Sequence, residues 1–316
     1  MRATGRRTAI AAIAAIAWIA GSAVGSMSTL PAAASAAGIV LGRAHADHTP
    51  DPTGRRTIRI LAVGSDARPG QNPLRLRADS IHVIFLHPRK QQAVVVGIPR
   101  DSWVSIPGRG SNKINAGLTG GPELLVRTIE RNFGARIDYW AVTSFWGIQE
   151  MVNDVGGLDV RVPFRMQDRS SGSNFRAGMR HLSGKEVLAF SRDRKSVPAG
   201  DFGRQENGGR VFLAALAQFQ KEYRDDPGAL LRWIGAGTRN MATDLPVTEL
   251  IDLAFDVTGV KLKDVRNVVL PGGTASIGGA SVVTLSTGAA RAIFSDAKVD
   301  GALRRGNVPR SPTGFG

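Results

Sequence analysis

Short apolar segments alternate with amphipathic segments between residues 58 and 300, and this alternation limits the possible folds more than any other feature. Ile58–Val63, Ser80–Leu86 and Ala93–Ile98 are short runs rich in β-branched residues, each followed by glycine or proline, as is typical of strands. From Gly121 to Asn132, apolar residues recur at helical spacing. Strands that alternate with helices predict a three-layer α-β-α sandwich around a central mixed β-sheet.

The rest of the chain continues this pattern. The other predicted strands are 139–143, 158–162, 265–270 and 282–285, the other predicted helices are 145–153, 183–190, 210–223, 229–240, 247–257 and 288–298, and the polar stretch 165–181 is predicted as a loop.

The N-terminus predicts where the protein works. Three arginines within the first seven residues precede an uncharged stretch from Thr8 to Gly42, which is long enough for a spanning helix of about 20 residues. Positive charge before the stretch predicts a single-pass protein of the cell membrane with an exported body. A cleaved signal peptide, which would give a secreted protein, is the alternative, since Ala34–Ala36 and Ala44–Ala46 both have the A-x-A pattern.

These features predict four parts. Residues 1–42 are a membrane anchor or signal segment, 43–57 are a linker, 58–300 form an extracytoplasmic domain, and 301–316 are a flexible C-terminal tail.

Composition excludes several classes of site. The chain has no cysteine, so disulfide scaffolds, thiolate metal sites and cysteine nucleophiles are absent, and none of its five histidines lies in an HExxH pattern. The net charge is +15, of which only +3 lies in the first fifty residues. A body this basic is expected to bind an anion. For an exported protein, a wall polymer, a membrane surface or a lipid-linked phosphate fits better than nucleic acid.

Acid and arginine residues recur together at the ends of the predicted elements. The stretches are Ser65–Arg68, Arg77–Ser80, Pro99–Asp101, Lys113–Ala116, Ser191–Arg194 and Asp201–Arg204. Guanidinium groups grip two phosphate oxygens at once, and carboxylates beside them hold Mg²⁺ that is shared with phosphate. Several cations in one cleft also repel one another without an anion. The pattern therefore predicts a pyrophosphate site.

In this order, the motifs resemble those of the LytR–CpsA–Psr family of cell-wall glycopolymer ligases. The resemblance runs from about Ile58 to Tyr223. It rests on ILAVGSDARPG, LRADSIHVIFLHP, VVVGIPRDSWVSIPG, NKINAGLTGGPELLVRTIE, IDYWAVTSFWGIQEMVNDVGGLDVRVP, LSGKEVLAFSRDR and GDFGRQEN. The resemblance implies the fold of that family. It also implies a Mg²⁺-dependent (or Mn²⁺-dependent) phosphotransferase that moves a phospho-glycopolymer from polyprenyl pyrophosphate to a hydroxyl of peptidoglycan or a related wall glycan. Polyprenyl phosphate is released.

The resemblance also implies roles for individual residues. Asp66 and Asp79 match the acids associated with the metal, and the catalytic set is Asp66, Asp79, Arg100 and Asp101. The residues expected to contact pyrophosphate are Arg77, Arg100, Lys113, Asn115, Arg192, Arg194 and Arg204. Asp101 is expected to orient Arg100 or to act as the acceptor base. Phosphoryl transfer depends on positioning and charge neutralisation, so no covalent nucleophile is needed.

Two points extend the resemblance. Apolar helix residues either line a tunnel for the polyprenyl chain or form ordinary core; they are Leu124, Leu125, Ile129, Phe145, Ile148, Val152, Leu188, Phe212 and Leu216. The chain also departs from the family, because Asn207-Gly208 stands where many members have Arg-Gln.

Two alternative functions remain open from sequence. A polyprenyl-pyrophosphate hydrolase would use the same cationic clamp, and a non-catalytic binder of anionic wall polymer or lipid would need only the basic surplus. A transcription regulator is disfavoured, because the sequence has no evident helix-turn-helix pattern and begins with an export segment.

Overall fold

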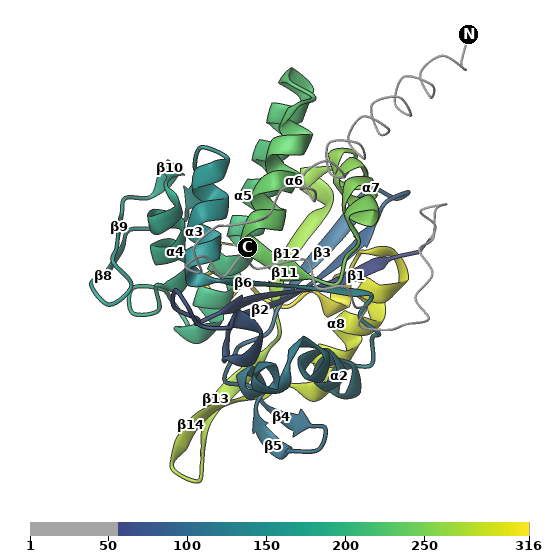
Figure 1. Cartoon of the computed structure of the whole chain (residues 1–316). Coiled ribbons are helices and arrows are strands. Elements are labelled where there is room, and N and C mark those ends of the chain that lie inside the picture. Colours follow the sequence, from purple (N-terminus) through teal and green to yellow (C-terminus); the bar gives the residue numbers. More distant parts are fainter. Residues whose placement is uncertain (1–55, 316) are drawn as a thin grey trace. The chain divides into compact units, whose positions relative to one another are not determined.

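The computed structural model describes residues 56–315, and its centre is a six-stranded mixed sheet. The strand order is β11-β6-β1-β2-β3-β12 (Figure 1). These strands are β1 (Ile58–Ser65), β2 (Ala78–His87), β3 (Gln92–Gly97), β6 (Tyr139–Ser144), β11 (Met241–Thr243) and β12 (Val265–Val269). β1 is antiparallel to β2 and parallel to β6, and β12 is parallel to β3. The sheet is mixed, as the sequence predicts.

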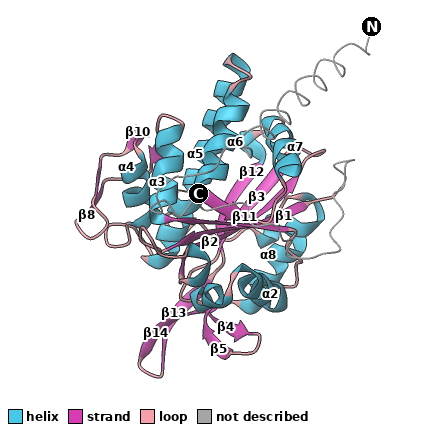
Figure 2. Ribbon diagram, viewed as in Figure 1, coloured by secondary structure: helices cyan, strands magenta, loops and turns pink. Residues whose placement is uncertain are grey.

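Helices cover both faces of this sheet, which gives the predicted three layers (Figure 2). α2 (Pro122–Phe133) and α8 (Thr287–Asp300) pack on one face and contact each other. α3 (Phe145–Asp154) and α5 (Asp201–Asp225) pack on the other. Strands β2 and β3 are buried on both faces, which explains why their sequences are continuous apolar runs.

The remaining elements form small additions around the three layers. Four two-stranded sheets are formed by β4 (Trp103–Ile106) with β5 (Gly110–Lys113), β7 (Leu158–Val162) with β10 (Gly178–Leu182), β8 (Met166–Asp168) with β9 (Ser173–Phe175), and β13 (Gly272–Ile277) with β14 (Ala280–Leu285). The other helices are α4 (Gly184–Arg192), α6 (Ala229–Asn240) and α7 (Val247–Thr258), with short 3-10 turns at Pro73–Arg75, Ile114–Gly120, Leu262–Asp264 and Arg305–Asn307.

Two predicted elements differ from the structure. The predicted loop 165–181 contains strands β8 and β9 and most of β10, each only three to five residues long and therefore too short to show a periodic pattern. Helix α5 begins at Asp201 rather than at residue 210. Glycine residues often end a helix, but those of α5 allow close packing instead. A Cβ on Gly209 would lie 1.9 Å from Oδ1 of Asn267.

The structure bears differently on the two ends of the chain. The expected anchor or signal segment 1–42 and nearly all of the linker 43–57 lie outside the described residues. Within residues 56–315, no helix is long and apolar enough to cross a membrane. The flexible tail over 301–316 stays a prediction, although the structure gives residues 304–315 specific contacts with α5 and α8.

Candidate active site

Four charged side chains from distant parts of the chain meet where β2, the loop after β3 and the start of α5 come together. Buried Asp79 forms an ion pair with Arg100, and its other carboxylate oxygen lies 3.5 Å from Nη1 of Arg204. The same Nη1 donates a 2.9 Å hydrogen bond to the carbonyl of Asp79. Asp201 accepts a 3.1 Å hydrogen bond from Nε of Arg204 and lies 3.0 Å from Nη2. One buried carboxylate therefore bridges two guanidinium groups.

The hairpin β4–β5 brings two more predicted residues to this cluster. Nζ of Lys113 lies 3.0 Å from Oδ1 of Asp101. The backbone N–H of Asn115 donates a 3.2 Å hydrogen bond to the carbonyl of Arg100. Asn115 is buried, and this bond makes it a support for the loop that carries Arg100 and Asp101. Motifs that are separate along the chain therefore form one connected loop structure around Arg100.

Arginines from the end of α4 complete the group. The guanidinium of Arg192 lies over the ring of Phe145, with Cζ 4.5 Å from the ring centroid. Partial burial, and then the charge of Arg204, lower the pKa of Arg192. The pKa of Arg100 is also lowered, first by burial and then by the charge of Arg204, with a smaller contribution from Arg194. These shifts mean that the guanidinium groups act on one another.

The cluster is electrostatically incomplete. Five cations (Lys113, Arg100, Arg192, Arg194 and Arg204) face three carboxylates (Asp79, Asp101 and Asp201). Within residues 56–315, Nε of Arg100 is buried without a hydrogen-bond partner, and Oδ2 of Asp101 lies 3.9 Å from it. A buried unpaired donor is costly, so this arrangement favours an anion that supplies the missing acceptors.

An apolar cavity of about 160 Å³ adjoins the cluster. Asp79, Arg192 and Arg204 form its polar rim, and its wall comes from β1, β6 and helices α3, α4 and α5. Four of the predicted tunnel residues line it, namely Phe145, Ile148, Leu188 and Phe212. The volume is close to that of a cavity of about 150 Å³ that binds benzene, so it holds a short piece of hydrocarbon.

The other predicted tunnel residues are core. Leu124, Leu125 and Ile129 belong to α2 on the opposite face of the sheet and pack in the main core there. Val152 belongs to the core beneath β7, and Leu216 packs beside β12. Helical spacing identifies an apolar face but not the side of the sheet that the face covers.

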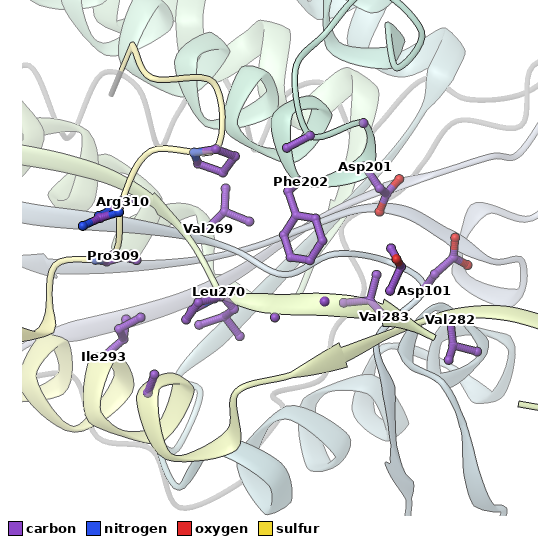
Figure 3. Close-up of a pocket in the computed structure, with 18 of the residues that line it drawn as sticks. Asp101, Asp201, Phe202, Val269, Leu270, Val282, Val283, Ile293, Pro309 and Arg310 are labelled. Carbon is purple, nitrogen blue, oxygen red and sulfur yellow. The ribbon is translucent and has the colours of Figure 1, made fainter. Parts of the chain in front are cut away.

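A second and larger cavity, of about 1,110 Å³, lies beside the same cluster (Figure 3). Asp101, Arg194 and Asp201 line one end of it. Further lining comes from the hairpin β13–β14, helix α8 and the C-terminal segment Gly306–Pro312. The two cavities share no lining residue, and the contacts Asp79–Arg204–Asp201 run from the wall of one to the wall of the other.

The structure thus brings together Asp79, Arg100, Asp101, Lys113, Asn115, Arg192, Arg194 and Arg204. Asp66 and Arg77 are joined by a backbone hydrogen bond of 3.3 Å between the Asp66 N–H and the Arg77 carbonyl. Both side chains are exposed, and among residues 56–315 neither forms an ion pair with the cluster. Their roles stay predictions.

Sequence reasoning missed Asp201 as a site residue. It belongs to the motif Asp201–Arg204, and the available signal was its position one helical turn before Arg204. At Asn207-Gly208, the departure from the family pattern, Asn207 is fully buried, and within residues 56–315 its side-chain amide has no hydrogen-bond partner. Gly208 lines the apolar cavity.

The carboxylates fit only a metal that is shared with the substrate. Within residues 56–315, no three His, Asp or Glu side chains gather closely enough to hold a metal ion. Asp66 and Asp79 lie near the ends of neighbouring strands, but Asp79 is already paired with two guanidinium groups. Mg²⁺ is commonly bound by one or two carboxylates together with phosphate oxygens and water. The donor set therefore fits Mg²⁺ when phosphate is present.

Fold and site together define an α/β protein with a binding site for an anion. This site is rich in positively charged side chains and lies between a small apolar cavity and a larger one. The LytR_cpsA_psr family model matches residues 33–298. This chain belongs to the LytR–CpsA–Psr family.

Individual relatives agree with this assignment. The chain is 33% identical over 222 residues to "Polyisoprenyl-teichoic acid--peptidoglycan teichoic acid transferase TagU" of Bacillus mycoides, a match covering 68% of this chain and 69% of the relative. The crystal structure of Bacillus subtilis TagV matches with a TM-score of 0.63 and 26% identity, covering 78% of this chain and 98% of TagV. A structure of TagT bound to LI-WTA has the same fold, with a TM-score of 0.66 and 22% identity, covering 83% of this chain and 98% of TagT.

Proposed function

We propose that the protein transfers a phospho-glycopolymer from a polyprenyl-pyrophosphate carrier to a hydroxyl of peptidoglycan or a related wall glycan. The observation that carries this proposal is the position of Arg192. Its guanidinium lies on the ring of Phe145 at the rim of the apolar cavity and within the field of Arg204. A polyprenyl pyrophosphate has the same junction of hydrocarbon and diphosphate. The name of the TagU relative, a transferase acting between polyisoprenyl-teichoic acid and peptidoglycan, supports the choice of substrates.

The cationic residues hold the diphosphate and neutralise the charge that develops on it. Arg100, Arg192, Arg194 and Arg204 present guanidinium groups that bind phosphate oxygens in pairs. Asp79 keeps Arg100 and Arg204 in place before substrate binds. Such preorganised charge accelerates phosphoryl transfer because the groups need not reorganise in the transition state.

Transfer itself exchanges one P–O bond for another. The acceptor oxygen bonds to the phosphorus that carries the glycan, and the bond from this phosphorus to the bridging oxygen breaks. Polyprenyl phosphate leaves with the bridging oxygen and its electron pair. The acceptor proton passes to Asp101, whose side chain is 22% exposed, compared with 13% for Asp201. Lys113, 3.0 Å away, keeps the Asp101 carboxylate oriented.

Asp66 and Asp79 are the residues that would hold Mg²⁺ in this proposal. When bound, the ion would neutralise charge on the diphosphate oxygens. Since only these two carboxylates are assigned to the ion, we expect Mg²⁺ to bind tightly only together with pyrophosphate. Calorimetric titration of Mg²⁺ with and without inorganic pyrophosphate tests this, and equal affinity in the two titrations would contradict it.

The proposal places the domain on the outer face of the cytoplasmic membrane. The uncharged stretch after the N-terminal arginines supports an anchor, and the lipid carrier requires a domain beside the bilayer. Protease added to intact spheroplasts should digest the body of the protein. Protection until the membrane is lysed would reverse the proposed orientation.

The activity is tested with the full chain in detergent micelles. Supplied with a polyprenyl-pyrophosphate-linked glycan and peptidoglycan strands, the protein should release polyprenyl phosphate and label the strands. If release occurs equally without strands and no strand is labelled, the protein is a hydrolase. If no release occurs, it is a binder. The variant D79N should abolish strand labelling.

A further inference from the structure

The proposed reaction uses the apolar cavity for the lipid carrier and leaves the large cavity beside the anion cluster without a role. We infer that it is the binding site for the acceptor glycan strand, an inference that rests on the proposed transfer reaction. At about 1,110 Å³, it lies just above the range of about 300–1,000 Å³ typical of ligand pockets. It is therefore large enough for several sugar units.

The lining suits a glycan. Figure 3 shows the ring of Phe202 between the carboxylates of Asp101 and Asp201 on one side and Arg310 on the other. An aromatic face packs against the C–H face of a sugar ring, and the polar groups around it bond the hydroxyls. Val269, Leu270 and Pro271 add an apolar floor.

The C-terminal wall of this cavity is fixed by a buried acid. Glu206 in α5 is 1% exposed and accepts hydrogen bonds from Oγ of Ser311 at 2.7 Å and from the N–H of Thr313 at 3.1 Å. Arg210, 3.2 Å from Glu206, donates a 2.6 Å hydrogen bond to the carbonyl of Phe315. We call these hydrogen bonds from Glu206 and Arg210 to residues 311–315 the latch. The latch holds Arg310 beside the cavity, so the wall is preorganised.

The opposite wall of the cavity is joined directly to the loop that carries Arg100 and Asp101. The N–H of Val283 in β14 donates a 2.9 Å hydrogen bond to the carbonyl of Asp101, and Ser102 pairs with Val283 as an isolated bridge. A glycan strand bound against β13–β14 would therefore contact a wall that is hydrogen-bonded to Asp101, the residue proposed to take the acceptor proton.

The chemistry of transfer assigns this cavity to the acceptor rather than to the carrier. Attacking and leaving oxygens lie roughly in line in phosphoryl transfer. The leaving polyprenyl phosphate places the part of its chain nearest the phosphate in the apolar cavity, whose wall includes Asp79 and Arg204. The attacking hydroxyl must come from elsewhere, and the large cavity is reached through Asp201 on the other side of the same guanidinium.

The test measures transfer by the full chain at fixed donor and varied concentrations of short peptidoglycan strands. R310A and F202A should each raise the KM for strands about tenfold and leave the KM for the donor unchanged. R305A is the matched control, because Arg305 is exposed on the same segment but does not line the cavity. It should leave both constants unchanged. A rise in the donor KM instead would assign the cavity to the glycan of the donor and overturn the inference.

A second measurement separates this inference from the proposed function. Hydrogen exchange of the full chain with peptidoglycan strands alone should slow at residues 271–283 and 304–313. S311A, which removes one bond of the latch, should weaken this protection. Protection elsewhere, or none, contradicts the acceptor site even if transfer occurs. Absence of transfer with protection intact contradicts the proposed reaction and leaves the glycan site in place.

Discussion

Two arginine–aspartate groups in this protein use the same residue types for different ends. In β1, Arg59 donates from Nε and Nη2 to the two carboxylate oxygens of Asp138 at 2.8 and 2.7 Å, and its backbone N–H adds a third bond at 2.8 Å. At the candidate active site, Asp79 is shared by Arg100 and Arg204, and Nε of Arg100 has no hydrogen-bond partner within residues 56–315.

The difference teaches how to tell a structural pair from a binding site. The Arg59–Asp138 pair is closed: its carboxylate is buried and both oxygens are used by one guanidinium. The Asp79 cluster is open, with more cations than carboxylates and a lowered pKa for Arg100. A closed pair stabilises the fold, whereas an open cluster keeps its bonding capacity for a ligand.

The largest expected effect is on turnover. R204A should lower the rate of transfer about 10²–10³-fold, because it removes a preorganised donor from the developing charge. The matched variant R59A should keep its rate per folded molecule, measured at low temperature. Equal losses in both variants would erase the distinction between the open and closed groups.

For stability, we expect the larger effect at the closed Arg59–Asp138 pair. D138A leaves the guanidinium of Arg59, itself only 15% exposed, without its partner and should lower the free energy of unfolding by about 3 kcal/mol. D300A, which breaks the exposed pair with Lys90, should cost less than about 1 kcal/mol. Urea denaturation measures both, and a smaller loss for D138A than for D300A would contradict the assignment.

Acid should destabilise the fold through His82, a buried neutral neighbour of the open cluster. Burial first, and the charge of Arg204 in addition, lower its pKa to about 4, against a bond to the carbonyl of Gln205. Above about pH 6.5, the pKa of His82 in the unfolded chain, the imidazole is neutral in both states and costs no stability. As the pH drops from about 6.5 to 4, the unfolded chain binds a proton that the folded protein does not, and the free energy of unfolding falls by about 3 kcal/mol in all. H82Q should flatten that part of the stability profile, and an unchanged slope would contradict the assignment.

The smallest effect is stabilisation by an anion. Inorganic pyrophosphate at ten times its Kd should raise the free energy of unfolding by about 1.4 kcal/mol. Calorimetry should show a higher Tm for the natural chain and for R59A but not for R100A. A rise of equal size in R100A would locate the anion elsewhere.

The sequence predicted most of the fold because the central strands carry their own signal. β1, β2 and β3 are rich in apolar and β-branched residues and end at glycine or proline. β2 and β3 are buried on both faces, whereas in the second half of β1 every second residue is buried. The strands within 165–181 gave no such signal, since they are three to five residues long and stabilised by local pairing. The start of α5 was hidden because glycine chosen for close packing resembles glycine that ends a helix.

For the candidate site, the sequence predicted the cations that gather but not the way they are held. Arg100 and Arg204 follow from motifs at element ends, and the structure joins them through Asp79. Glu206 carried no such signal. Its partners Ser311 and Thr313 lie more than a hundred residues away, and nothing in the spacing relates a helix to a distant tail. Long-range hydrogen bonds have no local pattern from which to infer them.

The parallel pairing of β12 with β3 has a consequence for how the molecule is made. Residues 265–269 must close a chain loop of more than 160 residues before that edge of the sheet exists. Contacts so distant in sequence form slowly, because the entropy of loop closure comes before the gain from pairing. The hairpin β13–β14, helix α8 and residues 306–312 follow β12 in the chain, so the large cavity that they line can form only after they have been synthesised. A nascent chain that lacks residues 265–312 therefore lacks this cavity, however much of the rest of the sheet has already folded.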